Sequence, residues 1–158
     1  MYSSPVDPRL LEQALTYCLD FGKEMIRRKG EFYAFGAVIS SAGKVEAVGA
    51  DLGEEHPQPE AVYRLLQNSL QQRFKEKAII ASAIAAHVDI PREYSPKYAD
   101  GIRVHLEATG FSRFIYLPYF RPKIATVARL FGKKPDVSYG DMISVDVPSQ
   151  VCAQATGT

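Results

Sequence analysis

Residues 35–120 constrain the fold most, because they are patterned as strand, turn, strand, helix and three further strands. The run Phe35–Ser40 is apolar on both of its faces, and the polar turn 41–43 connects it to a second strand at 44–49. A strand without a polar face has to be covered on both sides. These residues therefore predict a hairpin whose first strand lies inside a sheet.

Helical periodicity flanks the hairpin on both sides. Asp7 and Pro8 form a favourable helix start, since Asp7 accepts from free N–H groups and proline is tolerated at the first helical position. An apolar stripe follows, and Gly30 can end this helix. A second amphipathic stripe predicts a helix that begins at residue 59 or 60 and ends at Lys75.

The run 78–90 is rich in alanine, which favours helix, but its position after a helix and before Pro91 favours a strand. In that strand, alanines would occupy one face, where a helix could approach closely, together with His87. Apolar and polar residues alternate over 102–107, and residues 113–120 form a third run of strand type. A last helix is expected over 123–131.

We therefore expect an α+β single domain over residues 1–135, with a mostly antiparallel five-stranded sheet flanked by helices. The expected order is helix, strand, strand, helix, three strands and helix. Periodicity is lost after Pro135, which predicts an irregular C-terminal extension over 136–158 that is frayed at its end. The predicted core consists of Leu11, Leu15, Met25, Val38, Leu65, Leu66, Ile84, Val104 and Ile115.

Composition narrows the class of protein. The 158 residues are 46% apolar and 23% charged, with a net charge of +1, which is typical of a globular domain and argues against nucleic-acid binding. No apolar run approaches the roughly 20 residues that span a bilayer. Cys18 and Cys152 are too few for a disulfide framework, and no secretion signal is visible. These features predict a cytoplasmic protein without membrane contact.

Histidines and carboxylates offer one candidate catalytic cluster. His87 with Asp89, and His105 with Glu107, each share one face of a predicted strand. If these strands pair, the four side chains would form a cluster suited to a small hydrolase-like enzyme. The alternative, which we favour, is that they are polar residues on half-exposed strands. The three histidines are scattered and no cysteine pair exists, so we expect no metal and no cofactor.

Aromatic and basic residues offer a candidate interface near Pro118. Tyr116, Tyr119, Phe120 and Arg121 are of the types enriched at the centres of protein interfaces. The alternative places the aromatics in the core and the arginine at its rim. All charges from Arg113 to Lys134 are basic, whereas all charged Asp, Glu, Lys and Arg side chains of residues 46–60 are acidic. Such asymmetry fits a charged protein partner or a self-complementary dimer.

The order of elements from Asp7 to Phe131 resembles the roadblock/LC7 family of profilin-like domains. Residues 37–49, with an apolar strand, a small-Gly turn and a returning strand, resemble that family's opening hairpin. The resemblance implies a homodimeric adaptor without catalytic activity of its own, often a partner of small GTPases. The alanine-rich third strand, the long loop 91–100 and the tail after Pro135 depart from the family pattern.

The hairpin is also similar to that of the zinc-dependent nucleoside deaminases. Those enzymes need a His or Cys ligand with a Glu two residues later and a downstream Pro-Cys-x-x-Cys. Here the corresponding region is 56–62, and no downstream cysteine pair follows His56. This resemblance therefore implies a catalytically dead deaminase-like domain.

We expect a non-enzymatic protein-interaction or regulatory module, either a homodimeric adaptor or an inhibitor of a protein partner. The alternatives are the small hydrolase-like enzyme and the dead deaminase-like domain. A structure can distinguish an enzyme from an interaction module. An enzyme needs its polar side chains in a concave pocket, whereas a module needs an exposed patch.

Overall fold

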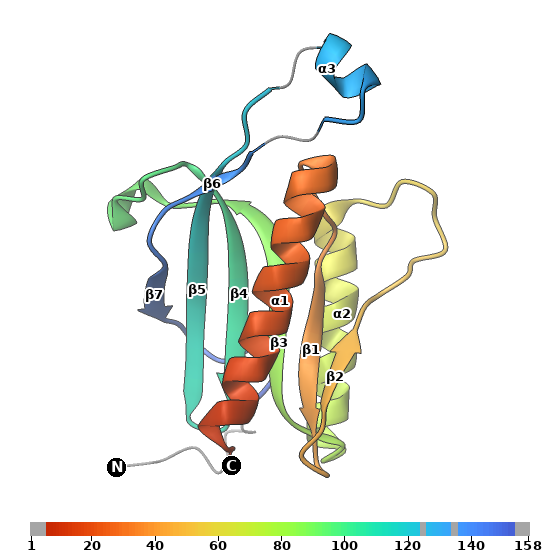
Figure 1. The fold of residues 1–158 in the computed structure, drawn as a ribbon. Helices are drawn as coiled ribbons and strands as arrows, with labels where there is room; N and C mark the ends of the chain where they lie inside the picture. The colour runs from red at the N-terminus through yellow and green to blue at the C-terminus, as the bar shows by residue number, and fades with distance from the viewer. Residues whose placement is uncertain (1–5, 124–125, 134–135, 154–158) are drawn as a thin grey trace.

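One antiparallel sheet with a long helix on each face forms the body of the protein (Figure 1). A computed structural model describes residues 6–123, 126–133 and 136–153. The sheet order is β2-β1-β3-β4-β5-β6, and β7 also pairs with β5. The helices are α1 (Pro8–Lys29), α2 (Pro59–Lys75), α3 (Thr126–Leu130) and the 3₁₀ turn η1 (Arg92–Tyr94). The strands are β1 (Phe35–Ser40), β2 (Val45–Val48), β3 (Ile79–Asp89), β4 (Asp100–Ala108), β5 (Phe111–Phe120), β6 (Ser138–Tyr139) and β7 (Ile143–Asp146).

The α+β class and the antiparallel sheet are confirmed, but the expectation of five strands was wrong. Two further strands form in the C-terminal region that was expected to be irregular, with Tyr139 opposite Tyr119 and Asp146 opposite Arg113. They cover the edge of the ten-residue strand β5, which would otherwise present unpaired backbone groups. With two and four residues they are too short for a periodic signal in the sequence. No described helix has the length and apolar character needed to cross a bilayer.

The first helix begins and ends where the sequence predicts. The Asp7 side chain accepts a hydrogen bond from the backbone N–H of Arg9 at 2.9 Å, and Pro8 occupies the first turn. Gly30 adopts a left-handed conformation with φ of 81°, and its N–H donates to the Ile26 carbonyl. This cap needs positive φ, which glycine adopts without steric cost.

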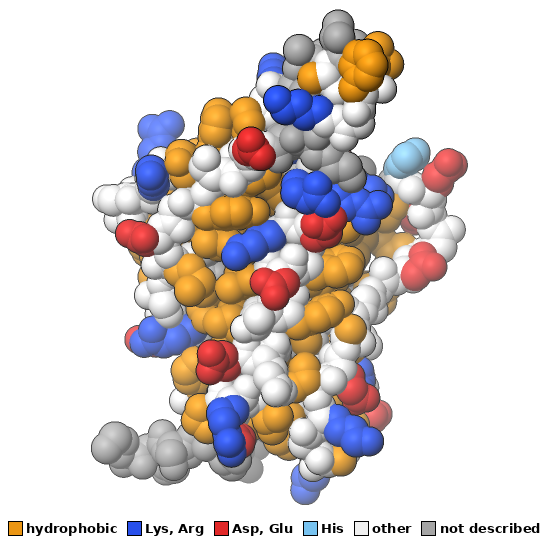
Figure 2. All heavy atoms as spheres, in the orientation of Figure 1, with side chains coloured by type: hydrophobic (Ala, Val, Ile, Leu, Met, Phe, Trp, Pro, Cys, Tyr) orange, Lys and Arg blue, Asp and Glu red, His pale blue; other side chains and the backbone are white. Residues whose placement is uncertain are grey.

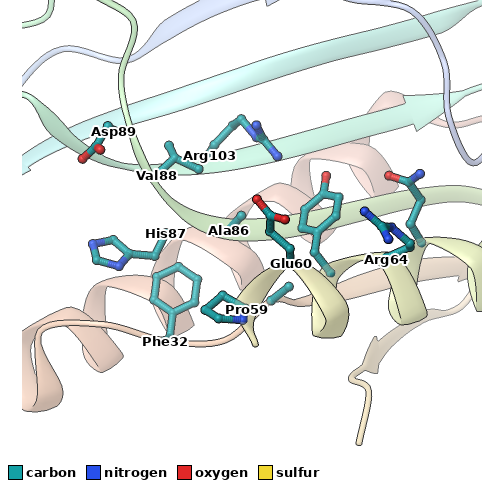
Figure 3. A pocket seen from close by; sticks show the side chains of 12 residues that line it. Phe32, Pro59, Glu60, Arg64, Ala86, His87, Val88, Asp89 and Arg103 are labelled. Carbon is teal, nitrogen blue, oxygen red and sulfur yellow. The ribbon is translucent and has the colours of Figure 1, made fainter. Parts of the chain in front are cut away.

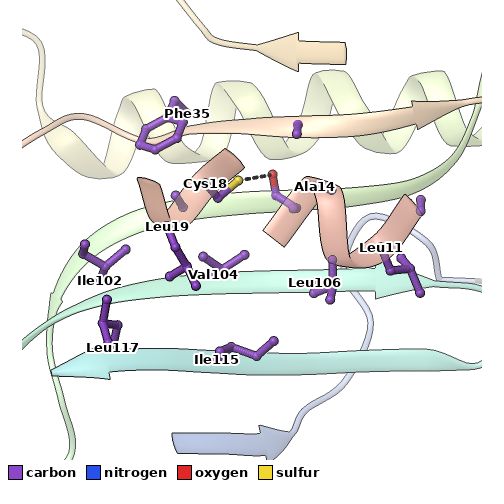
Figure 4. Close-up of a cluster of buried hydrophobic side chains, with 14 of the residues drawn as sticks. Leu11, Ala14, Cys18, Leu19, Phe35, Ile102, Val104, Leu106, Ile115 and Leu117 are labelled. Carbon is purple, nitrogen blue, oxygen red and sulfur yellow. Dashed lines mark hydrogen bonds between the residues drawn. The ribbon is translucent and has the colours of Figure 1, made fainter. Parts of the chain in front are cut away.

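Ala14, Cys18 and Leu19 of α1 pack over the sheet (Figure 4). The face of β3 that contacts α1 is built from alanines. Cys18 lies so close to this face that its Sγ is 3.8 Å from the Ala83 carbonyl oxygen. Gly22 lies against β4, where an added Cβ would be only 3.2 Å from Ile102. Small side chains on both partners therefore bring α1 close to the sheet, as the alanine-rich run predicted.

A second, smaller core lies between α2 and the opposite face of the sheet. Its buried α2 residues are Leu66 and Leu70, spaced by four residues, and Val62 is buried one turn earlier on the helix. Leu65 is 38% exposed, so its assignment to the core was wrong, because a helix turns about 100° per residue and Leu65 points away from this stripe. Met25 and Leu15 are half-buried, whereas the other predicted core residues are buried.

Adjacent leucines of α2 provide a matched test of this packing. Leu66 is 1% exposed, so Leu66→Ala should lower the free energy of unfolding by about 2–5 kcal/mol. Leu65→Ala should change it by less than about 1 kcal/mol, because the removed atoms already contact water. Urea unfolding followed by circular dichroism measures both variants. Equal losses in the two variants would contradict the observed orientation of α2.

Candidate functional site

A cleft lies between the N-terminal half of α2 and strands β3 and β4 (Figure 3). We call it the Arg103 pocket, and its volume is about 570 Å³. Its walls are formed by Phe32, Ala34, Pro59, Glu60, Tyr63, Arg64, Gln67, Ala86, His87, Val88, Asp89 and Arg103. The pocket forms because α2 packs on β3 and leaves the neighbouring face of β4 uncovered.

Arg103 is the most unusual side chain of this pocket. Its guanidinium carbon lies 4.3 Å from the centre of the Phe114 ring and 5.4 Å from that of Tyr63. Among the described residues, no Asp or Glu forms an ion pair with it, and its buried Nε–H has no acceptor. A buried donor without an acceptor costs about 1–3 kcal/mol. The cation is thus held by aromatic rings rather than by an anion.

Arg103 lowers the pKa values of two neighbouring tyrosines, in opposition to the effect of their burial. Burial raises the pKa of Tyr63, and the Arg103 guanidinium opposes that shift by its charge and by hydrogen bonding. Burial likewise raises the pKa of Tyr116, with Arg103 again opposing the shift. Both phenols therefore remain protonated and neutral at physiological pH, and they do not neutralise the arginine.

The remaining charges of the pocket are distributed along its length. Glu60 and Arg64 project from successive turns of α2 toward the sheet strands, and Asp89 lies at the far end beyond His87 and Val88 (Figure 3). With Arg103, the charged residues are two arginines and two carboxylates, so they sum to zero. The pocket therefore has no strong net electrostatic field, but a negatively charged group of a ligand can still bind next to one of its arginines.

The structure does not bring the four predicted catalytic residues together. Across β3 and β4, His87 lies opposite Ile102, and His105 lies opposite Ile84. Residues opposite each other share a face, and faces alternate along a strand, so His87 and His105 lie on opposite faces of the sheet. His87 Nε2 instead forms a hydrogen bond of 2.5 Å with the Tyr119 hydroxyl, and its ring packs near Phe32.

His105 and Glu107 do form a pair, but it lies in the interior. Their exposed fractions are 2% and 0%, and His105 Nδ1 is 3.5 Å from Glu107 Oε2. His105 Nε2 lies 2.8 Å from Ser112 Oγ, which gives the residue types of a hydrolase triad. Burial lowers the pKa of His105, the Glu107 charge opposes this, and Arg103 adds to it.

The Glu107 carboxylate binds the C-terminal segment. The backbone N–H groups of Gln150, Val151 and Cys152 donate to Oε1 at 2.8, 3.1 and 3.2 Å. Three consecutive donors satisfy the charge, and Val151 and Cys152 are buried beside it. This arrangement supports a structural role, and sequence reasoning missed it because backbone donors leave no signal in the side chains.

The predicted interface residues are mostly occupied inside the molecule. Tyr116 and Tyr119 are buried, and Arg121 Nε donates to the Ile26 carbonyl at 2.8 Å, at the end of α1. Phe120 alone is well exposed, at 52%. This placement matches the alternative in which the aromatics belong to the core.

A different exposed element lies beyond β5. The helix α3 stands away from the body of the protein at the end where α1 finishes (Figure 1). Leu130 and Phe131 are 79% and 85% exposed, and Arg129 and Lys133 beside them are also exposed. We call these four residues the α3 tip. Ile124 and Lys134, which belonged to the predicted helix and basic run, lie outside the described residues.

Next to the Arg103 pocket lies a second pocket of about 410 Å³, which we call the Tyr33 pocket. Phe32, Pro59 and His87 belong to both pockets and separate them. The other residues of the Tyr33 pocket are Met25, Lys29, Glu31, Tyr33, Glu55 and His56. Within the part of the chain that the structure describes, no three His, Cys, Asp or Glu side chains are grouped to hold a metal ion.

Comparison with known proteins gives no relative: no protein-family model, no curated protein and no solved structure matches this chain.

Lowering the pH should destabilise the protein through His105. Its pKa is lowered in the fold, so on acidification below about pH 6.5 the unfolded chain binds a proton that the folded protein resists. The stability contributed by neutral His105 is complete above that pH and falls as the pH drops toward the folded pKa. His105→Gln should flatten this dependence in urea unfolding at pH 7.5, 6.5 and 5.5. A control, His56→Gln in the exposed β2–α2 loop, should retain it; a flattened profile in the control alone would contradict the assignment.

Proposed function

We propose that this protein is a non-enzymatic interaction module that associates with a second copy of itself through the α3 tip. The observation that carries the proposal is the exposure of Leu130 and Phe131, at 79% and 85%. Large adjacent apolar side chains on a projecting element are costly in water and are typical of a surface covered by a partner. The enclosed His105–Glu107 pair, which has no access for a substrate, gives no comparable support to an enzyme.

The Tyr33 pocket is the surface that complements this tip. Met25, Phe32, Tyr33 and Pro59 provide apolar walls for Leu130 and Phe131.

Charge supports the same pairing. Glu31 and Glu55 outnumber Lys29 at the Tyr33 pocket, so the two acids would face Arg129 and Lys133 of the other copy with one opposing cation beside them. Further acidic side chains lie on the β2–α2 loop, at the same end of the molecule as α3 (Figure 2). The charges would set the orientation of docking and its salt sensitivity, while burial of the apolar pair would supply most of the affinity.

Because each copy carries both a tip and a pocket, two reciprocal contacts would form a closed two-fold dimer. A homodimer without catalytic activity is also what the resemblance to the roadblock/LC7 family implies.

Removal of the apolar pair should dissociate the dimer. Leu130→Ser with Phe131→Ser should weaken association at least about tenfold, since each buried large side chain contributes more than 1 kcal/mol. Phe120→Ser is the matched control, because it removes an equally apolar side chain that is exposed elsewhere. Sedimentation equilibrium at micromolar concentration measures all three proteins. A monomeric wild type would overturn the proposal, as would a control that dissociates while the double variant does not.

Charge reversal identifies the contacting surfaces. Glu31→Lys with Glu55→Lys in one copy, and Arg129→Glu with Lys133→Glu in another, should each impair self-association by placing like charges together. When the two variants are mixed, every tip meets a pocket of opposite charge, so a mixed dimer should form. Failure of the mixture to associate would show that these two surfaces do not meet.

A further inference from the structure

We propose that the Arg103 pocket binds a small organic carboxylate whose body is flat and apolar. This site adjoins the proposed dimer contact across the shared wall of Phe32, Pro59 and His87. The residue that would bind the carboxylate, Arg103, belongs to the Arg103 pocket alone.

Arg103 offers what such a ligand needs. A guanidinium presents its donors in a planar fork that matches the two oxygens of a carboxylate. The Phe114 and Tyr63 rings lie 4.3 and 5.4 Å from the guanidinium carbon and restrict the movement of this fork. Arg103 forms hydrogen bonds with Tyr63 and Tyr116, but the described chain supplies neither a carboxylate partner nor an acceptor for Nε, so part of the guanidinium's binding capacity is unused.

The walls beside Arg103 define the rest of the ligand. Ala86 lies directly opposite Arg103 across the β3–β4 ladder, and this small side chain leaves space next to the guanidinium. Val88, Phe32 and Pro59 continue the apolar wall along the pocket. A ring attached to the carboxylate would lie against this wall and would release water from it.

The flanking charges favour a carboxylate over a phosphate. Arg64 adds a second cation at the pocket, but Glu60 and Asp89 add two carboxylates. A singly charged ligand gains the contact with Arg103 at little cost from these acids, whereas a doubly charged phosphate would be repelled more strongly.

Benzoate is the probe, and benzamide and phenyl phosphate are its comparisons. Titrations followed by ¹H–¹⁵N NMR and by calorimetry should give saturable benzoate binding with Kd on the order of millimolar, typical for so few ligand atoms. The largest amide shifts should fall at residues 63–67, 86–89 and 103. Benzamide, which has the same shape without the charge, and phenyl phosphate should each bind at least about tenfold more weakly.

Variants assign the binding to Arg103. Arg103→Gln should abolish benzoate binding, and Arg103→Lys should retain a weaker form, because lysine keeps the charge but loses the fork. Arg64→Glu, at an exposed position where folding is not at risk, should weaken binding several-fold. Arg73→Gln in the last turn of α2 is the matched control and should bind as the wild type does. Thermal unfolding confirms that each variant is folded.

The proposal is overturned if benzoate fails to saturate, if benzamide binds equally well, or if folded Arg103→Gln retains wild-type affinity. Tighter binding of phenyl phosphate would overturn the assignment to carboxylates. Leu130→Ser with Phe131→Ser should bind benzoate normally, so failure of the dimer and failure of the anion site are distinguishable.

Discussion

The close contact of α1 with the alanine face of β3 determines how the rest of the molecule is arranged. Ala81, Ala83 and Ala85 leave room for the helix, and Gly22 lets it approach Ile102 of the next strand. The long helix can therefore cover β1, β3 and β4 together. On the opposite face, larger residues such as Ile84 keep α2 over β3. Part of β4 then lacks a helix above it, and this part carries the polar residues of the candidate site.

The protein covers this part of β4 in two different ways. At one end, Glu107 is enclosed by the C-terminal segment, whose N–H groups replace the water that a carboxylate would otherwise need. At the other end, Arg103 has aromatic neighbours but no carboxylate partner among residues 6–123, 126–133 and 136–153, and the pocket beside it is open. The Glu107 carboxylate thus has hydrogen-bond donors within the chain, whereas the Arg103 guanidinium has no carboxylate partner among the described residues. This difference is why we assign a structural role to one and a binding role to the other.

Local features of the fold were predictable, and features that depend on register were not. The Asp7 cap, the Gly30 stop and the alanine face follow from neighbouring residues, so the sequence was sufficient for them. Whether His87 and His105 share a face depends on the alignment of two strands, because a shift by one residue would exchange the faces. The pocket likewise depends on how far α2 extends over β4, which no local pattern encodes. Leu130 and Phe131 were expected near a helix end, but their exposure depends on the projection of α3 from the body.

The two pockets share a wall, so their ligands could influence each other only if that wall moves. The centre of the Phe32 ring lies 5.3 Å from that of Phe35 and 5.9 Å from that of His87. His87 in turn forms a hydrogen bond with the buried Tyr119. Contacts with core residues therefore fix the position of this wall. We expect the dimer site and the anion site to bind independently of each other. Since linkage is reciprocal, saturating benzoate should leave the association constant of the dimer unchanged in sedimentation equilibrium. A change of about tenfold would mean a coupling of about 1.4 kcal/mol and a wall with two arrangements.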